Sequence, residues 1–446
     1  MRKQFALGLT GCLVLSAGIV RAQDMKMDKP MNMPMDIKGS SATPAASDDN
    51  MEMGAGPNAQ SGMAGALGNY SMTRDGSGTT WQPDSTPMEG LHGLWGDWST
   101  MLHGSLTGIY TKQGGPRGGN QVFSESMIMG MAQSQIGDGQ LTIRAMLSLD
   151  PFMGKRGYPL LLQTGETADG VTPLIDRQHP HDLFMELSGI YSHPLGENAS
   201  AFLYVGYPGE PALGPVTFMH RFSGMTNPEA PLGHHWLDAT HVTFGVVTGG
   251  VVLDNWKIEG SLFKGREPDQ NRWNFDAVTL DSASARVSYN PTDNWSFQVS
   301  YGYIKSPEQL EPAQNQHRTT ASATYNMPFD NGNWQTTFAW GQNIVSGGST
   351  SNAFLLESAA SWYSHTLFGR IERTGKDELF PAPGPLHGVM FDVGKFSLGY
   401  VYDIPVFEHV SLGLGAMGSL YDLPAALKPS YGSPASYTLF TRLKLL

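Results

Sequence analysis

The chain has 446 residues and a formal net charge of −12, which argues against nucleic acid as a partner because phosphates are repelled by a negative surface. Charged residues make up only 15%, against roughly 25% in ordinary soluble domains, while 54 glycines and 10% aromatic residues are typical of an all-β chain with many turns. The single cysteine, Cys12, lies near the N-terminus, so a disulfide, a thiolate metal site and a cysteine nucleophile are excluded for the rest of the chain.

The first 22 residues have the pattern of a secretory signal. A basic start is followed by an apolar stretch over 5–20 and by small residues before a cleavage point after Ala22. The segment Leu9–Cys12 also fits a lipoprotein cleavage box, which is the alternative. Beyond the leader we find no apolar run of about 18 residues, so no transmembrane helix is expected. A secreted chain of this kind is periplasmic, extracellular or an outer-membrane barrel.

Residues 23–90 lack hydrophobic periodicity and are rich in Met, Gly, Pro, Ser and Asp, so we predict a disordered periplasmic tail. Thioether sulfur is a soft ligand that suits Cu(I), and a chain of such ligands captures the ion without a preformed site. The alternative is a compositional bias without a metal role. The candidate copper ligands of the tail are Met25, Met27, Met31, Met33, Met35, Met51 and Met53.

Residues 91–446 alternate polar and apolar side chains in strand-length segments. In 294–304, for example, Trp295, Phe297 and Val299 point to one face, and the small polar residues between them point to the other. Most segments reach the roughly 9–11 residues that a tilted strand needs to cross a membrane. The sixteen predicted strands span about 100–111, 120–132, 139–149, 183–193, 199–207, 239–248, 251–263, 279–289, 294–304, 317–326, 333–342, 353–363, 365–373, 394–403, 408–419 and 435–446.

The connections between these segments alternate between short and long, which is the pattern of an outer-membrane barrel. The wet faces carry charges well inside the strands, which a dry core would not hold. We therefore predict an all-β fold, a transmembrane antiparallel β-barrel of about 16 strands whose termini lie on the periplasmic side. The charged residues of the wet faces are Arg144, Glu186, Lys257, Glu259, Arg286, Glu357, Arg370 and Glu372.

Six of the thirteen histidines lie between residues 179 and 241, in or next to the two longest predicted loops, 150–182 and 208–238. Imidazoles with neighbouring carboxylates bind divalent metals such as Cu(II), Zn(II) or Ni(II). The alternative is that His, Asp and Arg only hydrogen-bond these loops to the barrel wall, and both can be true. The candidate metal ligands are His179, His181, His220, His234, His235 and His241.

Glu125, Met127, Met129 and Met131 share one face of the second predicted strand. If that face lines the lumen, it offers a ladder of thioethers. If it faces lipid, the methionines are apolar filler.

Four blocks resemble a poorly characterised group of predicted Gram-negative outer-membrane proteins, over roughly residues 90–446. They are DRQHPHDLFMEL from Asp176, GEPALGPVTFMHR from Gly209, NPEAPLGHHWLDATH from Asn227 and GREPDQNRWNFD from Gly265. That resemblance implies a barrel and no established activity. The Met-rich region separately resembles the N-terminal part of B-type copper-resistance outer-membrane proteins, which implies a copper role.

The leading hypothesis is a non-enzymatic outer-membrane barrel that handles copper or another metal ion by resistance, binding or export. The tail would gather the ion, and the histidine-rich loops would bind or gate it. Copper is the candidate cofactor, and the expected partners are outer-membrane lipid, the barrel-assembly machinery and copper ions. The alternatives are a general or solute-selective porin without a metal role, a plugged structural or adhesive barrel, and an outer-membrane hydrolase, for which we find no nucleophile–base pair.

Overall fold

The computed structural model describes residues 63–445. The predicted signal peptide, the seven candidate methionines of the tail and Leu446 lie outside the described residues. Within 63–445, no helix has the length and the apolar character needed to cross a membrane.

Strands are the main regular secondary structure of the described chain. In chain order they are β1 Leu91–Trp95, β2 Trp98–Gln113, β3 Gly119–Ile136, β4 Gly139–Leu147, β5 Tyr158–Thr167, β6 Pro173–Gln178, β7 Phe184–Gly196, β8 Ala199–Gly206, β9 Val246–Leu253, β10 Trp256–Phe263, β11 Ser282–Thr292, β12 Trp295–Lys305, β13 Asn315–Phe329, β14 Gly332–Val345, β15 Thr350–Trp362, β16 His365–Lys376, β17 Phe391–Phe407, β18 Val410–Asp422 and β19 Ala435–Leu445. Two single-turn helices, α1 His234–Leu237 and α2 Lys428–Tyr431, lie in long connections.

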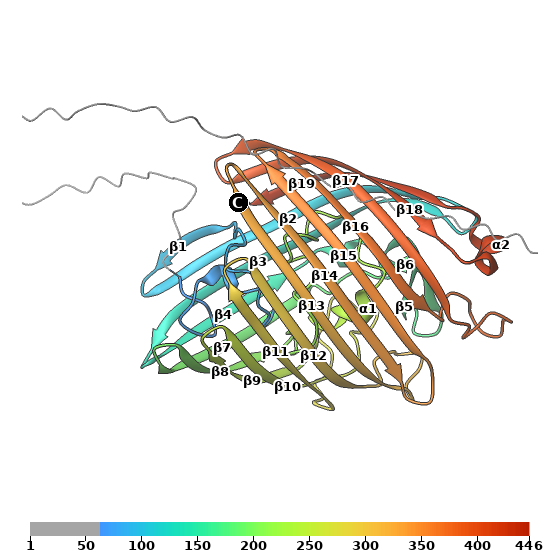
Figure 1. Cartoon of the computed structure of the whole chain (residues 1–446). Coiled ribbons are helices and arrows are strands. Elements are labelled where there is room, and N and C mark those ends of the chain that lie inside the picture. Colours follow the sequence, from blue (N-terminus) through green and yellow to red (C-terminus); the bar gives the residue numbers. More distant parts are fainter. Residues whose placement is uncertain (1–62, 446) are drawn as a thin grey trace, which may run out of the picture. The chain divides into compact units, whose positions relative to one another are not determined.

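Sixteen of these strands close into one antiparallel barrel (Figure 1). Seventeen strands form the main sheet, but β1 pairs only with the start of β2, and β5 and β6 form a separate hairpin. The barrel closes where β19 pairs with β2. Two-residue turns join the strands at one end, the short-turn end, and longer connections join them at the other, the long-loop end. The predicted fold class and strand count are confirmed.

The strands place apolar side chains outside and polar side chains inside. Along β12, Trp295, Phe297, Val299 and Tyr301 are exposed, whereas the residues between them are buried. All eight charged residues predicted on the wet faces are buried inside the barrel. An exterior of this kind matches a hydrocarbon environment rather than water.

Two neighbouring predicted strands have wrong bounds, since the predicted strand 251–263 contains the end of β9, a turn and the whole of β10. The segment 239–248 was expected to be a strand, but β9 starts at Val246 and continues to Leu253. The predicted bounds left Gly249 and Gly250 between two strands. In the structure Gly250 leaves room for the Phe202 ring, since a Cβ there would lie 2.5 Å from a ring carbon. Gly250 therefore serves close packing inside a strand rather than a reversal of the chain.

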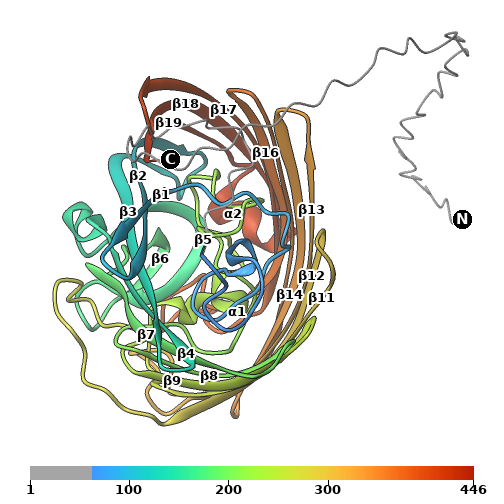
Figure 2. The same cartoon turned by 90° about the vertical axis from the view of Figure 1, so that its left-hand side faces the viewer.

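Residues 63–90, which we call the plug segment, are folded inside the barrel, although we expected a flexible tail up to residue 90 (Figure 2). Arg74 forms a bidentate ion pair with Asp84, in which both hydrogen bonds are 2.7 Å long. Thr79 donates to Glu259 of β10 at 2.6 Å and accepts from Arg286 of β11 at 2.9 Å. The segment also packs Ala66, Leu67 and Trp81 against apolar residues, so its polar and apolar contacts follow no fixed spacing along the chain.

Two long connections also enter the lumen: residues 148–183, the hairpin loop, which contains β5 and β6, and residues 207–245, the histidine loop, which contains α1 (Figure 2). Arg221 of the histidine loop contacts Glu357 of β15 at 2.7 Å. Glu229 of the same loop contacts the buried Lys395 of β17 at 2.5 Å. The lumen is therefore largely occupied by the chain itself, and several of its charges are paired within the protein.

Candidate functional site

A cavity of about 410 Å³ remains in the lumen beside the plug segment, along the wall that includes β2 and β3. Its lining includes Glu89 and Lys444 near the short-turn end, and it reaches His179 and His181 of the hairpin loop. The cavity thus extends from the short-turn end into the cluster of histidines. The methionines that line it are Met72, Met88, Met101, Met127, Met129, Met131, Met153, Met219 and Met225.

Three of these methionines belong to the second predicted strand, for which the sequence left open whether their face lines the lumen or faces lipid. Met127, Met129 and Met131 of β3 line the cavity, and Met129 and Met131 are buried. Ile128, between Met127 and Met129, is 48% exposed on the outer surface. Because successive side chains of a strand point to opposite faces, all three sulfurs are luminal.

The thioethers gather into two groups. Met63, Met72, Met101 and Met131 pack together with Met88 beside them, and the plug segment contributes three of the five. Met129, Met146 and Met185 pack together with Met127 and Met219. Thioethers brought together from the plug segment, the wall and the histidine loop offer several soft ligands within one compartment.

Five of the six predicted histidines form a chain of neighbouring rings. The ring centroids lie 5.3 Å apart for His181 and His241, 5.2 Å for His241 and His234, 5.6 Å for His234 and His235, and 6.2 Å for His235 and His179. These residues come from the hairpin loop and the histidine loop, so the two loops meet in the lumen. Their convergence was not visible in the sequence.

His220 stands apart from this chain. It lines the cavity, and its ring lies 6.5 Å from that of His103 on β2. His103 was missed in the sequence, although it follows Met101 at strand spacing and both point inward. The alternation of side chains that identified the methionines on one face of β3 would also have identified Met101 and His103 on one face of β2.

Three of the histidines have Nδ1 engaged by an oxygen at 2.8 Å or less, and Nδ1 of His179 lies 3.1 Å from the carbonyl oxygen of Pro180. His181 Nδ1 lies 2.8 Å from Asp150, His234 Nδ1 lies 2.7 Å from Asp238, and His241 Nδ1 lies 2.8 Å from the carbonyl oxygen of Asp238. This is how metal-binding imidazoles are commonly oriented, with the other nitrogen left for the ion. Within 63–445, however, the ligand atoms of these three rings do not come within 4.8 Å of one another.

Burial keeps several of these histidines neutral. Desolvation lowers the pKa of His179 and of His220 to about 3, and it lowers the pKa of His235 and His241 well below the usual value. A neutral imidazole is the form that binds a metal. The Nε2 atoms of all four are buried and lack a hydrogen-bond partner among the described residues.

The same loops also carry the structural contacts of the alternative interpretation. Arg221 contacts Asp238 at 3.0 Å as well as Glu357, and Arg370 of β16 contacts Glu357 at 2.9 Å. Asp238 therefore both orients His234 and takes part in the ion pairs that hold the histidine loop to the wall. Anchoring and histidine placement are coupled in this protein.

No protein-family model matches this chain, and no curated protein sequence does either. Two solved structures match by fold with TM-scores of 0.50. Salmonella typhi OmpF in complex with daunomycin is 10% identical and covers 80% of this chain and 100% of its own; Pseudomonas putida OprB at high pH is 8% identical and covers 78% and 94%. An anion-selective porin from Comamonas acidovorans is 10% identical, covers 78% of this chain and 100% of its own, and has a TM-score of 0.46.

At this low identity the likeness establishes the fold alone. The class that fold and lumen define is a closed 16-strand antiparallel β-barrel of the outer-membrane type, filled by its own N-terminal segment and two loops. The resemblances to an uncharacterised barrel group and to copper-resistance proteins stay predictions.

Proposed function

We propose that this protein is a non-enzymatic outer-membrane barrel that handles copper by binding Cu(I) along the methionine-lined cavity and passing it toward the histidines. The observation that carries the proposal is the lining itself: nine methionines around one luminal cavity that ends at His179 and His181. An ordinary aqueous pore needs hydrated polar walls, and thioethers do not serve that purpose.

The chemistry of the ligands supports copper over harder ions. Thioether sulfur is soft and suits Cu(I), whereas Mg²⁺ and Ca²⁺ require oxygen ligands. The Met clusters supply several sulfurs, so the ion would exchange among neighbours without leaving soft coordination. The neutral imidazoles beyond them suit copper in either oxidation state.

In this proposal the short-turn end faces the periplasm. The tail, cleaved from its signal at Ala22, collects copper there and delivers it to the cavity mouth near Glu89 and Lys444. The barrel is embedded in outer-membrane lipid through its apolar exterior and reaches that membrane through the barrel-assembly machinery.

The test is a Cu(I) titration of the full-length protein in detergent against a chromogenic chelator. Replacing Met127, Met129 and Met131 together with leucine keeps the volume nearly constant, since Leu and Met exchange at low cost in cores. We expect the triple variant to bind at least one Cu(I) fewer per chain than the wild type.

The matched control is Met327→Leu, because Met327 of β13 is 37% exposed on the outer surface. This variant should bind as much Cu(I) as the wild type. Unchanged stoichiometry and affinity in the triple variant would overturn the proposal.

The porin alternative is favoured by the fold, since barrels of this size usually hold an aqueous channel. Planar-bilayer recordings separate the two functions. Large steady conductance that is indifferent to copper would support a porin, and low conductance together with Cu(I) binding would support copper handling. Neither conductance nor binding would indicate a plugged structural barrel.

A further inference from the structure

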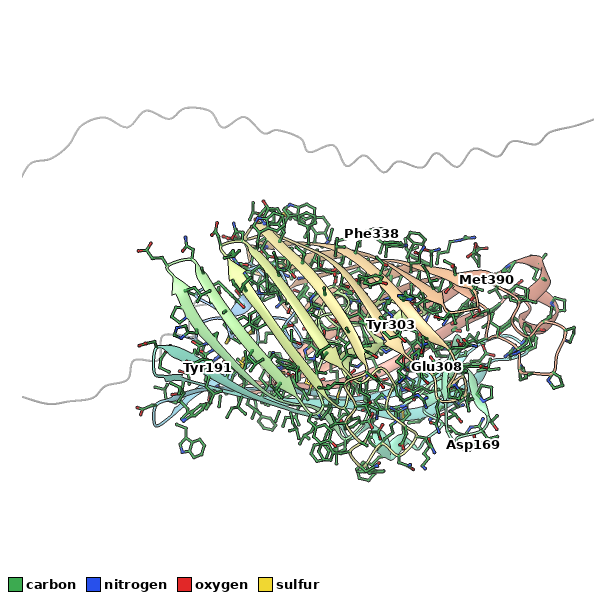
Figure 3. All side chains as sticks on the ribbon, turned by 90° about the horizontal axis from the view of Figure 1, so that it is seen from below. Asp169, Tyr191, Tyr303, Glu308, Phe338 and Met390 are labelled. Carbon is green, nitrogen blue, oxygen red and sulfur yellow. The ribbon has the colours of Figure 1, made fainter. Side chains whose placement is uncertain are left out.

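We infer that the long-loop end of the lumen contains a separate site for a divalent first-row transition-metal ion, formed by His235, Glu267 and Glu308. It lies outside the methionine cavity and does not depend on the proposed copper function. The three residues belong to three different connections, the histidine loop, 264–281 and 306–314. Glu308 lies at the same end of the barrel as Asp169 and Met390 (Figure 3).

The three side chains converge on one point. One ligand atom from each lies within 4.8 Å of those of the other two, and within 63–445 this is the only such group of three or more His, Cys, Asp or Glu residues. His235 Nδ1 lies 3.7 Å from Glu308 Oε1, too far for a hydrogen bond but suitable for two ligands of one ion. A small contraction around a bound ion would bring the ligand distances to the roughly 2.0–2.2 Å of Zn–N and Zn–O bonds.

His235 is held in the site without a partner. Its side chain is only 9% exposed, and its Nε2 lacks a hydrogen-bond partner among the described residues. Gly165 of β5 makes room for the ring, because a Cβ there would lie 2.0 Å from its Cε1. The neighbouring Glu166 amide donates to Glu308 Oε2 at 3.3 Å, so β5 orients a second ligand as well.

The two carboxylates lack a direct cation. Within 63–445 no lysine or arginine nitrogen comes within 4.0 Å of either one. A divalent ion would supply the positive charge that these two carboxylates lack.

The donor set also selects the ion. Two carboxylates and one imidazole suit a borderline divalent ion such as Zn²⁺, whereas a site without sulfur is poor for Cu(I). The protein would therefore hold soft ligands at one end of the lumen and harder ligands at the other.

The experiment is a Zn²⁺ titration of the full-length protein in detergent, followed by calorimetry and by the shift in thermal unfolding. The variants are Glu267→Gln and Glu308→Gln, which remove a ligand charge without changing side-chain size. We expect saturable binding by the wild type, and in each variant a loss of about tenfold or more in affinity together with loss of the thermal shift.

The control is Glu311→Gln, which removes the same charge from an exposed position in the loop that carries Glu308. It should bind Zn²⁺ as the wild type does. Failure of the wild type to bind Zn²⁺, or equal binding by both ligand variants, would overturn the inference. Because Cu(I) binding is measured separately with the methionine variant, either proposal can fail without the other.

Discussion

Replacing Glu357 with glutamine should lower the free energy of unfolding by about 3–5 kcal/mol, the usual cost of breaking a buried ion pair. Glu357 accepts hydrogen bonds from Arg221 at 2.7 Å and from Arg370 at 2.9 Å, and all three side chains are at most 2% exposed. Glutamine keeps the shape but removes the charge. Arg221 then keeps Asp238 and the carbonyl oxygen of Val216, whereas Arg370 keeps only the carbonyl oxygen of Glu229. The positive charge of Arg370 therefore stays buried without a paired carboxylate.

The measurement is guanidinium unfolding of the protein in detergent, followed by tryptophan fluorescence. The control is Asp392→Asn, the same chemical change in a pair with Arg373 whose side chains are 68% and 57% exposed. Exposed pairs contribute about 0–1 kcal/mol, so the control should unfold almost like the wild type. A loss below about 1 kcal/mol for Glu357→Gln would refute the view that this carboxylate anchors the histidine loop.

Three further predictions concern the plug segment, pH and the tail. Deleting residues 63–90 should raise single-channel conductance in planar bilayers, since these residues fill part of the lumen. Burial raises the pKa of Glu210 from its usual 4.5 to about 7, so ionising this carboxyl in the folded state costs free energy. Because the folded state favours the protonated carboxyl, the free energy of unfolding should fall by about 3 kcal/mol as pH rises from 4.5 to 7. Unfolding measured across that pH range should show no such fall in Glu210→Gln. Deleting residues 23–62 should reduce the number of Cu(I) ions bound in a chelator titration while the β-sheet circular dichroism stays unchanged.

Each of these has an outcome that contradicts it. Unchanged conductance after the plug deletion would mean that the loops alone close the lumen. Glu197→Gln in the β7–β8 turn is the control for Glu210, and equal pH slopes in both variants would refute the burial argument. A tail deletion with full Cu(I) binding would exclude the tail as a copper ligand.

The barrel could be predicted because its determinants are local. A strand exposes one face to lipid and one to the lumen, so side chains such as Trp295 and Phe297 alternate with Ser296 and Gln298 in the sequence itself. Strand number and the alternation of short and long connections follow from the same pattern. The error at 239–248 arose because a glycine such as Gly250 gives the same sequence signal whether it turns the chain or makes room for a neighbouring ring.

The inside of the barrel could not be predicted in the same way. The plug segment has no repeating pattern, because polar wall residues such as Glu259 and Arg286 hold it through single contacts from strands far away in the sequence. A composition typical of disorder is therefore compatible with order once the barrel supplies partners.

The sequence by itself determined an all-β barrel, its apolar exterior, its charged interior and a supply of histidine and methionine ligands. Only the tertiary structure decided which of these ligands meet. The chain of histidine rings joins residues of two loops, and the site at His235, Glu267 and Glu308 joins three connections. Such contacts depend on where long loops fold back into the lumen, and that choice is made by buried ion pairs rather than by any local periodicity.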